Sequence, residues 1–171
     1  MSGSPLRGPE FGSYPAADVG WLLNDLSGHE LEAPTAIREP AIQRGAAHYS
    51  ESLPIEYQPP AEYRELFRRL LGHWAPVVAA GVAALGEAIL SARDPQFTIV
   101  SLARAGTPVG ILLRRWLFRE HGLDVAHYAV SIIHRKGLDP EAVRWLQREV
   151  GLEQVVFVDG WKAANSFVKT I

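Results

Sequence analysis

The chain has 171 residues, of which 47% are hydrophobic and 21% charged, and its formal net charge is −2. These values are ordinary for a globular domain with a sizeable core, and they give no global attraction to nucleic acid or to an anionic membrane. The absence of cysteine from the chain excludes a disulfide framework, a thiolate nucleophile and cysteine-based metal sites within these residues.

The first 95 residues predict an unstructured start over residues 1–13, followed by a helical region over residues 14–95. Apolar residues at helical spacing indicate a short helix over residues 15–26, and a second helix is expected to begin near Pro40. A long helical region starts at Ala61. We therefore expect a helical N-terminal extension ahead of the main domain.

The most apolar part of this extension, residues 74–90, contains Pro76 and two glycines, and we expect the helix to break at Pro76. A segment of this length with such interruptions is too short to span a bilayer. We therefore expect no membrane contact and a cytoplasmic location.

Strand and helix patterns alternate over residues 96–171, which form the predicted α/β core. An Asp-Pro pair provides a favourable start for the second of the core helices. The short connections of this βαβαβ pattern predict a three-stranded parallel sheet with right-handed crossovers. The expected strands are 98–103, 125–133 and 154–158, and the expected helices are 107–120 and 139–150.

The first of these strands ends in a loop with the features of an anion site. The loop consists of Ala103, Arg104, Ala105 and Gly106, and a helix begins near Thr107. Backbone N–H groups at a helix N-terminus point toward a bound phosphate, glycine permits close approach, and Arg104 could add a charged contact. The alternative is an ordinary turn with a solvated arginine.

The third strand ends in a second polar loop, which contains Asp159, Gly160, Trp161 and Lys162. A carboxylate at the carboxyl end of a strand is placed to accept hydrogen bonds from two ribose hydroxyls, or to hold a metal through water. Lys162 offers a further phosphate contact, and Trp161 could stack on a base. The alternative role of Asp159 is that of a helix N-cap.

These two loops are expected to meet. In a parallel sheet of order 2-1-3, the first and third strands are neighbours and their connections diverge, which creates a crevice at the carboxyl ends. Arg104 and Asp159 would then face each other across a pocket sized for a phosphorylated sugar. The expected partner is therefore a phosphorylated small molecule, and nucleic acid is not expected.

The same segments resemble a known family. Residues 101–110 read Ser-Leu-Ala-Arg-Ala-Gly-Thr-Pro-Val-Gly, and residues 156–161 read Val-Phe-Val-Asp-Gly-Trp. Together with further matches within residues 38–51 and 127–133, they look like the ComF-like phosphoribosyltransferase family. That family is found with tellurite-resistance genes and is also labelled cysteine protease StiP.

The resemblance implies a type I phosphoribosyltransferase-like fold and a protein that binds phosphoribosyl pyrophosphate with Mg²⁺. The loop at residues 103–106 would hold the pyrophosphate, and Asp159 would begin the loop that holds the ribose and its 5-phosphate. Catalysis would be electrostatic, because donors and metal stabilise the departing pyrophosphate. The phosphoribose could pass to an unknown acceptor in a stress or tellurite-resistance context.

Departures from the family pattern lead to a second hypothesis. After Trp161 the family has Thr-Gly-Lys-Gly, whereas this chain has Lys-Ala-Ala-Asn and ends at Ile171, before the family pattern does. We therefore expect a truncated chain whose sheet is incomplete at its C-terminal edge and could form an oligomer there. The alternative function is a protein that keeps the fold and senses a nucleotide or sugar phosphate without catalysis. Cysteine protease activity is not expected, because there is no thiol.

Overall fold

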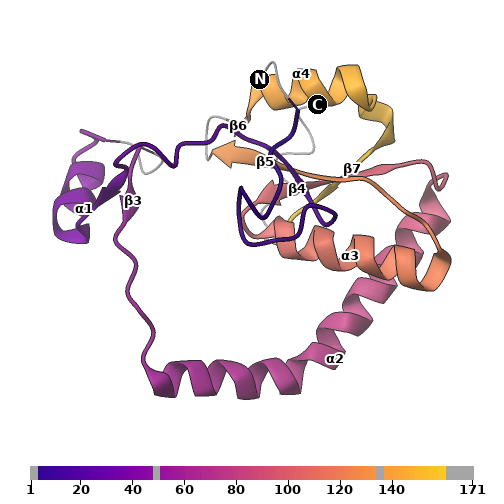
Figure 1. The fold of residues 1–171 in the computed structure, drawn as a ribbon, viewed down its shortest axis with the longest axis horizontal. Coiled ribbons are helices and arrows are strands. Elements are labelled where there is room, and N and C mark those ends of the chain that lie inside the picture. The colour runs from indigo at the N-terminus through magenta and orange to yellow at the C-terminus, as the bar shows by residue number, and fades with distance from the viewer. Residues whose placement is uncertain (1–3, 48–50, 134–136, 161–171) are drawn as a thin grey trace. The chain divides into compact units, whose positions relative to one another are not determined.

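The computed structural model describes residues 4–47, 51–133 and 137–160 (Figure 1). The chain divides into two compact units, one made of residues 1–25 with 77–171 and the other of residues 26–76. The predicted boundary between residues 95 and 96 falls within the first unit rather than between the two.

The first unit is built on an α/β sheet, as predicted. β1 (Gly20–Leu22), β5 (His127–Ile133), β4 (Thr98–Ala103) and β7 (Val155–Val158) lie side by side in this order and run parallel. β6 (Gly137–Leu138) pairs antiparallel with β5. The order β5-β4-β7 is the predicted 2-1-3 arrangement. The expectation of three strands was wrong, because β1 and β6 enlarge the described sheet to five.

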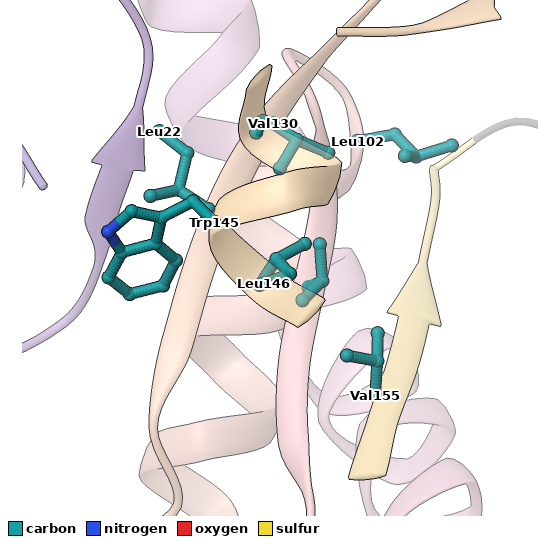
Figure 2. Packing of buried hydrophobic residues seen from close by; sticks show 8 residues of the cluster. Leu22, Leu102, Val130, Trp145, Leu146 and Val155 are labelled. Atoms are coloured by element: carbon teal, nitrogen blue, oxygen red, sulfur yellow. The ribbon is translucent and has the colours of Figure 1, made fainter. Parts of the chain in front are cut away.

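Helices cover both faces of this sheet, and β4 shows how the sequence directs them. Side chains of a strand alternate between faces. Val100 and Leu102 pack with α4 (Pro140–Glu149), whereas Ile99 packs with α3 (Gly106–His121). Figure 1 shows α3 and α4 on opposite sides of the strands. Figure 2 shows the α4 side, where these side chains meet: Leu22, Leu102, Val130, Trp145, Leu146 and Val155.

The start of α4 follows the predicted capping chemistry. The Asp139 side chain accepts a hydrogen bond from the Glu141 N–H at 2.9 Å, and Pro140 occupies the first turn. Proline suits that position because a backbone N–H in the first turn has no intrahelical partner, so its absence costs no helical hydrogen bond. The α3 helix ends at Gly122, whose φ of 68° is the left-handed conformation that favours glycine.

The predicted helix over residues 15–26 was wrong, because that stretch forms turns followed by β1. Pairing with β5 buries Val19 and Leu22 completely, which a short surface helix could not do. Gly20 permits this pairing: a Cβ there would lie 2.9 Å from the ring of Tyr128. Tertiary pairing therefore overrides the helical spacing of the apolar residues.

α2 (Ala61–Ala92) runs through Pro76, so the expected break at that residue was also wrong. Proline removes one helical hydrogen bond, to the carbonyl four residues earlier. That carbonyl belongs to Gly72, and both residues are exposed, so water can solvate the freed group. Farther along, Val82 is buried and Gly86 leaves room for the Trp116 ring, which a Cβ at residue 86 would overlap.

The continuity of α2 also changes the assessment of its length. By length and composition alone the helix could cross a membrane, and 6% of its most apolar window is buried. The sequence indicated a segment too short and too interrupted to span a bilayer, and the continuous helix α2 contradicts that expectation. That criterion is weak evidence for a membrane helix, and the cytoplasmic location stays a prediction.

The second unit contains a small parallel pair, β2 (Glu32–Ala33) with β3 (Leu53–Pro54), and the helix α1 (Thr35–Gln43). The helix predicted near Pro40 thus begins one turn earlier. Its first turn closes on the Pro34 carbonyl, which accepts hydrogen bonds from two N–H groups at 2.9 and 3.0 Å. The Arg38 side chain donates to the Ser52 carbonyl at 3.2 Å, which joins α1 to the approach of β3.

Candidate functional site

Two loops leave the sheet from neighbouring strands at the same edge. β4 and β7 pair in parallel from Thr98 with Val155 to Ser101 with Val158. Parallel strands end at the same edge, so the loop after β4 and the loop after β7 emerge together. The juxtaposition predicted for these two strands is therefore confirmed.

The two loops are in backbone contact, and glycine permits the approach on each side. A Cβ at Gly106 would lie 2.5 Å from the Val158 carbonyl oxygen and 3.1 Å from the Asp159 Cα. A Cβ at Gly160 would lie 2.6 Å from the Ala105 carbonyl oxygen. Real Cβ atoms do not approach backbone this closely, so each glycine is needed where the loops meet.

The first loop leads into the N-terminus of α3, which no side chain caps. Ala105 precedes the helix without a side-chain hydrogen bond to it, and the first turn has no acidic residue. The positive end of the helix dipole therefore faces no protein carboxylate from that turn. The peptide bond between Ala103 and Arg104 is cis. An uncapped helix N-terminus without acidic residues in its first turn is favourable for an anion.

Thr107 lies beneath this loop rather than on its surface. Its exposed fraction is 1%, and its N–H donates to the Arg104 carbonyl at 3.1 Å. Its hydroxyl oxygen has no hydrogen-bond partner within the described part of the chain. A buried hydroxyl without a partner is energetically costly.

The two charged residues predicted for the site differ in exposure. Arg104 is exposed on the first loop, and Asp159 is half-buried on the second. An Asp159 carboxylate oxygen accepts the N–H of Gly160, the next residue, at 2.7 Å. A helix N-cap accepts from a residue two or three positions later, and for Asp159 those positions lie outside the described residues. Two further predicted site residues, Trp161 and Lys162, lie outside the described residues.

A buried polar cluster next to these strands was missed by the sequence reasoning. The His127 imidazole lies with Nε2 2.8 Å from the Ser101 hydroxyl and Nδ1 2.8 Å from the Asp18 carbonyl oxygen. Gly110 of α3 makes room for the ring, which a Cβ at residue 110 would overlap. A serine inside an otherwise apolar strand was the available signal, because a buried hydroxyl requires a partner.

The surroundings keep this imidazole neutral. Burial lowers the pKa of His127 to about 4, the hydrogen bond to the Asp18 backbone opposes the shift, and the positive charge of Arg114 adds to it. Serine and histidine at this distance resemble a nucleophile and its base. However, Ser101 is 0% and His127 3% exposed, so no substrate reaches the hydroxyl. The pair is a structural feature of the core.

An ion pair lies beside this cluster. The Asp18 carboxylate accepts from Arg115 Nε at 2.9 Å and from Nη2 at 2.5 Å, and Asp18 itself is buried. Such a two-point contact fixes both side chains in orientation. The hydrogen bond to Asp18 raises the pKa of Arg115, so this guanidinium stays charged.

Comparisons with known proteins give one family. A family model described as "Tellurite-like stress resistance cysteine protease StiP" matches residues 12–171. A curated relative from Acinetobacter baylyi, named "Cysteine protease StiP", is 34% identical over 150 residues. The aligned part covers 88% of this chain and 38% of the relative, so the chain spans well under half of the relative's length. No solved structure matches the chain.

Proposed function

The chain belongs to the StiP family, and we propose that it binds phosphoribosyl pyrophosphate with Mg²⁺ and could transfer phosphoribose to an unknown acceptor. We also propose that its α/β core follows the type I phosphoribosyltransferase plan. The observation that supports both is the backbone contact between the loop at Gly106 and the loop at Gly160.

The contact supports this function because it brings complementary chemistry together. The uncapped N-terminus of α3 favours an anion, and Arg104 on the same loop can add a two-point contact to a phosphate. Asp159, on the adjoining loop, offers carboxylate oxygens to hydroxyl groups. A ligand that has a pyrophosphate beside two ribose hydroxyls satisfies both loops at once. Lys162 and Trp161 are proposed as further contacts for phosphate and base.

The described residues are compatible with Mg²⁺ that arrives with its phosphates. They contain no group of three metal-ligating side chains, and Asp159 is the carboxylate at the proposed site. Mg²⁺ is often held by one or two carboxylates together with substrate phosphates, so Asp159 and the pyrophosphate would share it. When bound, the ion neutralises charge on the pyrophosphate group.

The chain's own residues would act by position and charge. Arg104 and the amides of Ala105 and Gly106 would orient the pyrophosphate and stabilise the negative charge that develops as it leaves. Asp159 would hold the ribose at the same time. A protease function, which the relative's name states for that protein, is not proposed here: the chain has no cysteine, and its Ser101–His127 pair is buried.

Calorimetric titration with phosphoribosyl pyrophosphate and Mg²⁺ tests the proposal. Arg104→Ala and Asp159→Asn should each weaken binding by about 1–3 kcal/mol, or about 5- to 150-fold, because each removes a charged hydrogen bond. Asparagine can still accept the Gly160 N–H, so the second loop should keep its conformation. Arg119→Ala, on the exposed last turn of α3, is the matched control and should bind like the parent chain.

Absence of heat, or equal affinity in all three variants, would contradict the proposed site. Pyrophosphate release then separates the two functional hypotheses. An enzyme releases pyrophosphate when its acceptor is supplied. The sensing or scaffold alternative, which the glycine-free sequence after Trp161 favours, binds the ligand without releasing pyrophosphate.

A further inference from the structure

The N-terminal segment, defined here as residues 5–22, adds the strand β1 to one side of the sheet. Its own two ends are joined by a bridge, in which Leu6 and Trp21 exchange backbone hydrogen bonds of 3.0 and 2.8 Å. β1 pairs with β5 over only three residues. Such a short pairing leaves much of the attachment to other contacts: Val19 and Leu22 are buried in the core, and Asp18 binds both Arg115 and His127.

The proton positions around His127 follow from its partners. The Asp18 carbonyl oxygen can only accept, so Nδ1 must donate to it. In the neutral ring Nε2 then accepts, and the Ser101 hydroxyl donates. A second proton on the ring would force that hydroxyl to donate elsewhere. Its other acceptor, the Tyr128 carbonyl oxygen, lies at 3.4 Å, the far limit of a hydrogen bond.

The charges around the ring also oppose protonation. From α3, Arg114 acts on the imidazole unfavourably, and Arg115 occupies the Asp18 carboxylate. From the N-terminal segment, Asp18 is the single charged group that favours the protonated ring. From β4, the neighbour is the uncharged Ser101. Burial is the largest effect and lowers the pKa of His127.

We propose that His127 is an acid-sensitive latch: the neutral imidazole holds the N-terminal segment on the sheet, and protonation releases it. The fit of the ring depends on its charge state, since one nitrogen must donate to Asp18 while the other accepts from Ser101. Lifting the segment removes the Asp18 carbonyl from one side of the ring and opens the ring to water, where a charge is tolerated.

The sign of the effect follows from the two protonation states. The pKa of His127 is about 4 with the segment docked and returns toward the ordinary 6.5 when water reaches the ring. The open form therefore binds the additional proton, and opening becomes more favourable as pH falls from 6.5 toward 4. One proton corresponds to at most about a tenfold rise in the opening equilibrium for each pH unit. Above about pH 6.5 the proton is bound in neither form, so the opening equilibrium no longer depends on pH.

Hydrogen exchange of the full chain between pH 4.5 and 7.5, with each rate referred to the intrinsic rate at the same pH, tests the latch. The amides of Gly20 and Leu22, which flank Trp21 in the pairing with β5, should lose protection by up to about tenfold per pH unit below about 6.5. Core amides of β4 and α4 should keep their protection over the same range.

Four substitutions separate the latch from simple damage to the core. His127→Asn keeps a side-chain N–H for the Asp18 carbonyl but does not titrate, so the segment should have lower and pH-independent protection. His127→Phe has no donor and should leave the segment open at every pH. Asp18→Asn keeps the backbone carbonyl while removing the carboxylate, and the pH dependence should remain. His121→Asn, at the exposed end of α3, should match the parent chain.

Each opposite result would overturn the proposal. Segment protection that does not change with pH would do so, as would a pH dependence that persists in His127→Asn or disappears in Asp18→Asn. Simultaneous loss of protection in the segment and in the α4 core would also overturn it, because the opening would then be global unfolding.

Discussion

At the scale of single residues, Gly106 illustrates how one sequence feature can have a second cause. From the sequence, we interpreted this glycine as a residue that lets a ligand approach the backbone closely. The structure shows that another part of the chain approaches it: the Val158 carbonyl oxygen and the Asp159 Cα. Sequence alone identifies the need for a missing side chain, but it does not tell which atom occupies the space.

Two glycine-to-alanine substitutions should change the free energy of unfolding in opposite directions, because only one of the two glycines lies in this contact. Gly106→Ala should lower the free energy of unfolding by about 1–3 kcal/mol, because its Cβ would meet backbone atoms that cannot rotate away. Gly81→Ala, inside α2 with open space around it, should raise the free energy of unfolding by up to about 1 kcal/mol through helix propensity. Urea denaturation measures both.

The comparison also tests the site, since Gly106→Ala should push the two loops apart and weaken ligand binding. A Gly106→Ala chain as stable as the parent would show that the loops do not touch.

At the scale of elements, the sequence predicted best where local chemistry and tertiary packing agree. The strands β4, β5 and β7 and the Asp139 cap of α4 carry their signals in neighbouring residues, and all are confirmed. β1 was missed because its three residues gain their burial from β5, which is more than a hundred positions away in the chain. The His127 cluster was missed for the same reason, since its three members, His127, Ser101 and Asp18, lie on separate segments.

α2 and α3 provide a matched test of burial by element. Leu113 of α3 is 0% exposed and packs in the core, whereas Leu71 of α2 is 55% exposed. Leu113→Ala should therefore lower the free energy of unfolding by about 2–5 kcal/mol. Leu71→Ala should change it by no more than about 0.5 kcal/mol. Similar losses from both substitutions in urea denaturation would contradict the exposed face of α2.

At the scale of the whole molecule, the family and the order of the strands are those predicted from the sequence, while the ligand remains a proposal. The StiP match extends over residues 12–171, so the resemblance seen in a few motifs covers nearly the full chain. β7 ends the strand order among the described residues. The oligomer predicted at this edge stays a prediction. The relative is more than twice as long as its aligned part, so the activity of the whole protein is likewise a proposal.

Backbone amide shifts of the isotope-labelled chain, titrated with phosphoribosyl pyrophosphate and Mg²⁺, test most directly whether two loops form one site. The amides of Ala105, Gly106 and Gly160 should shift together and follow a single dissociation constant, because one ligand contacts both loops. Shifts confined to one loop, different dissociation constants for the two loops, or no shift in either would contradict the shared site.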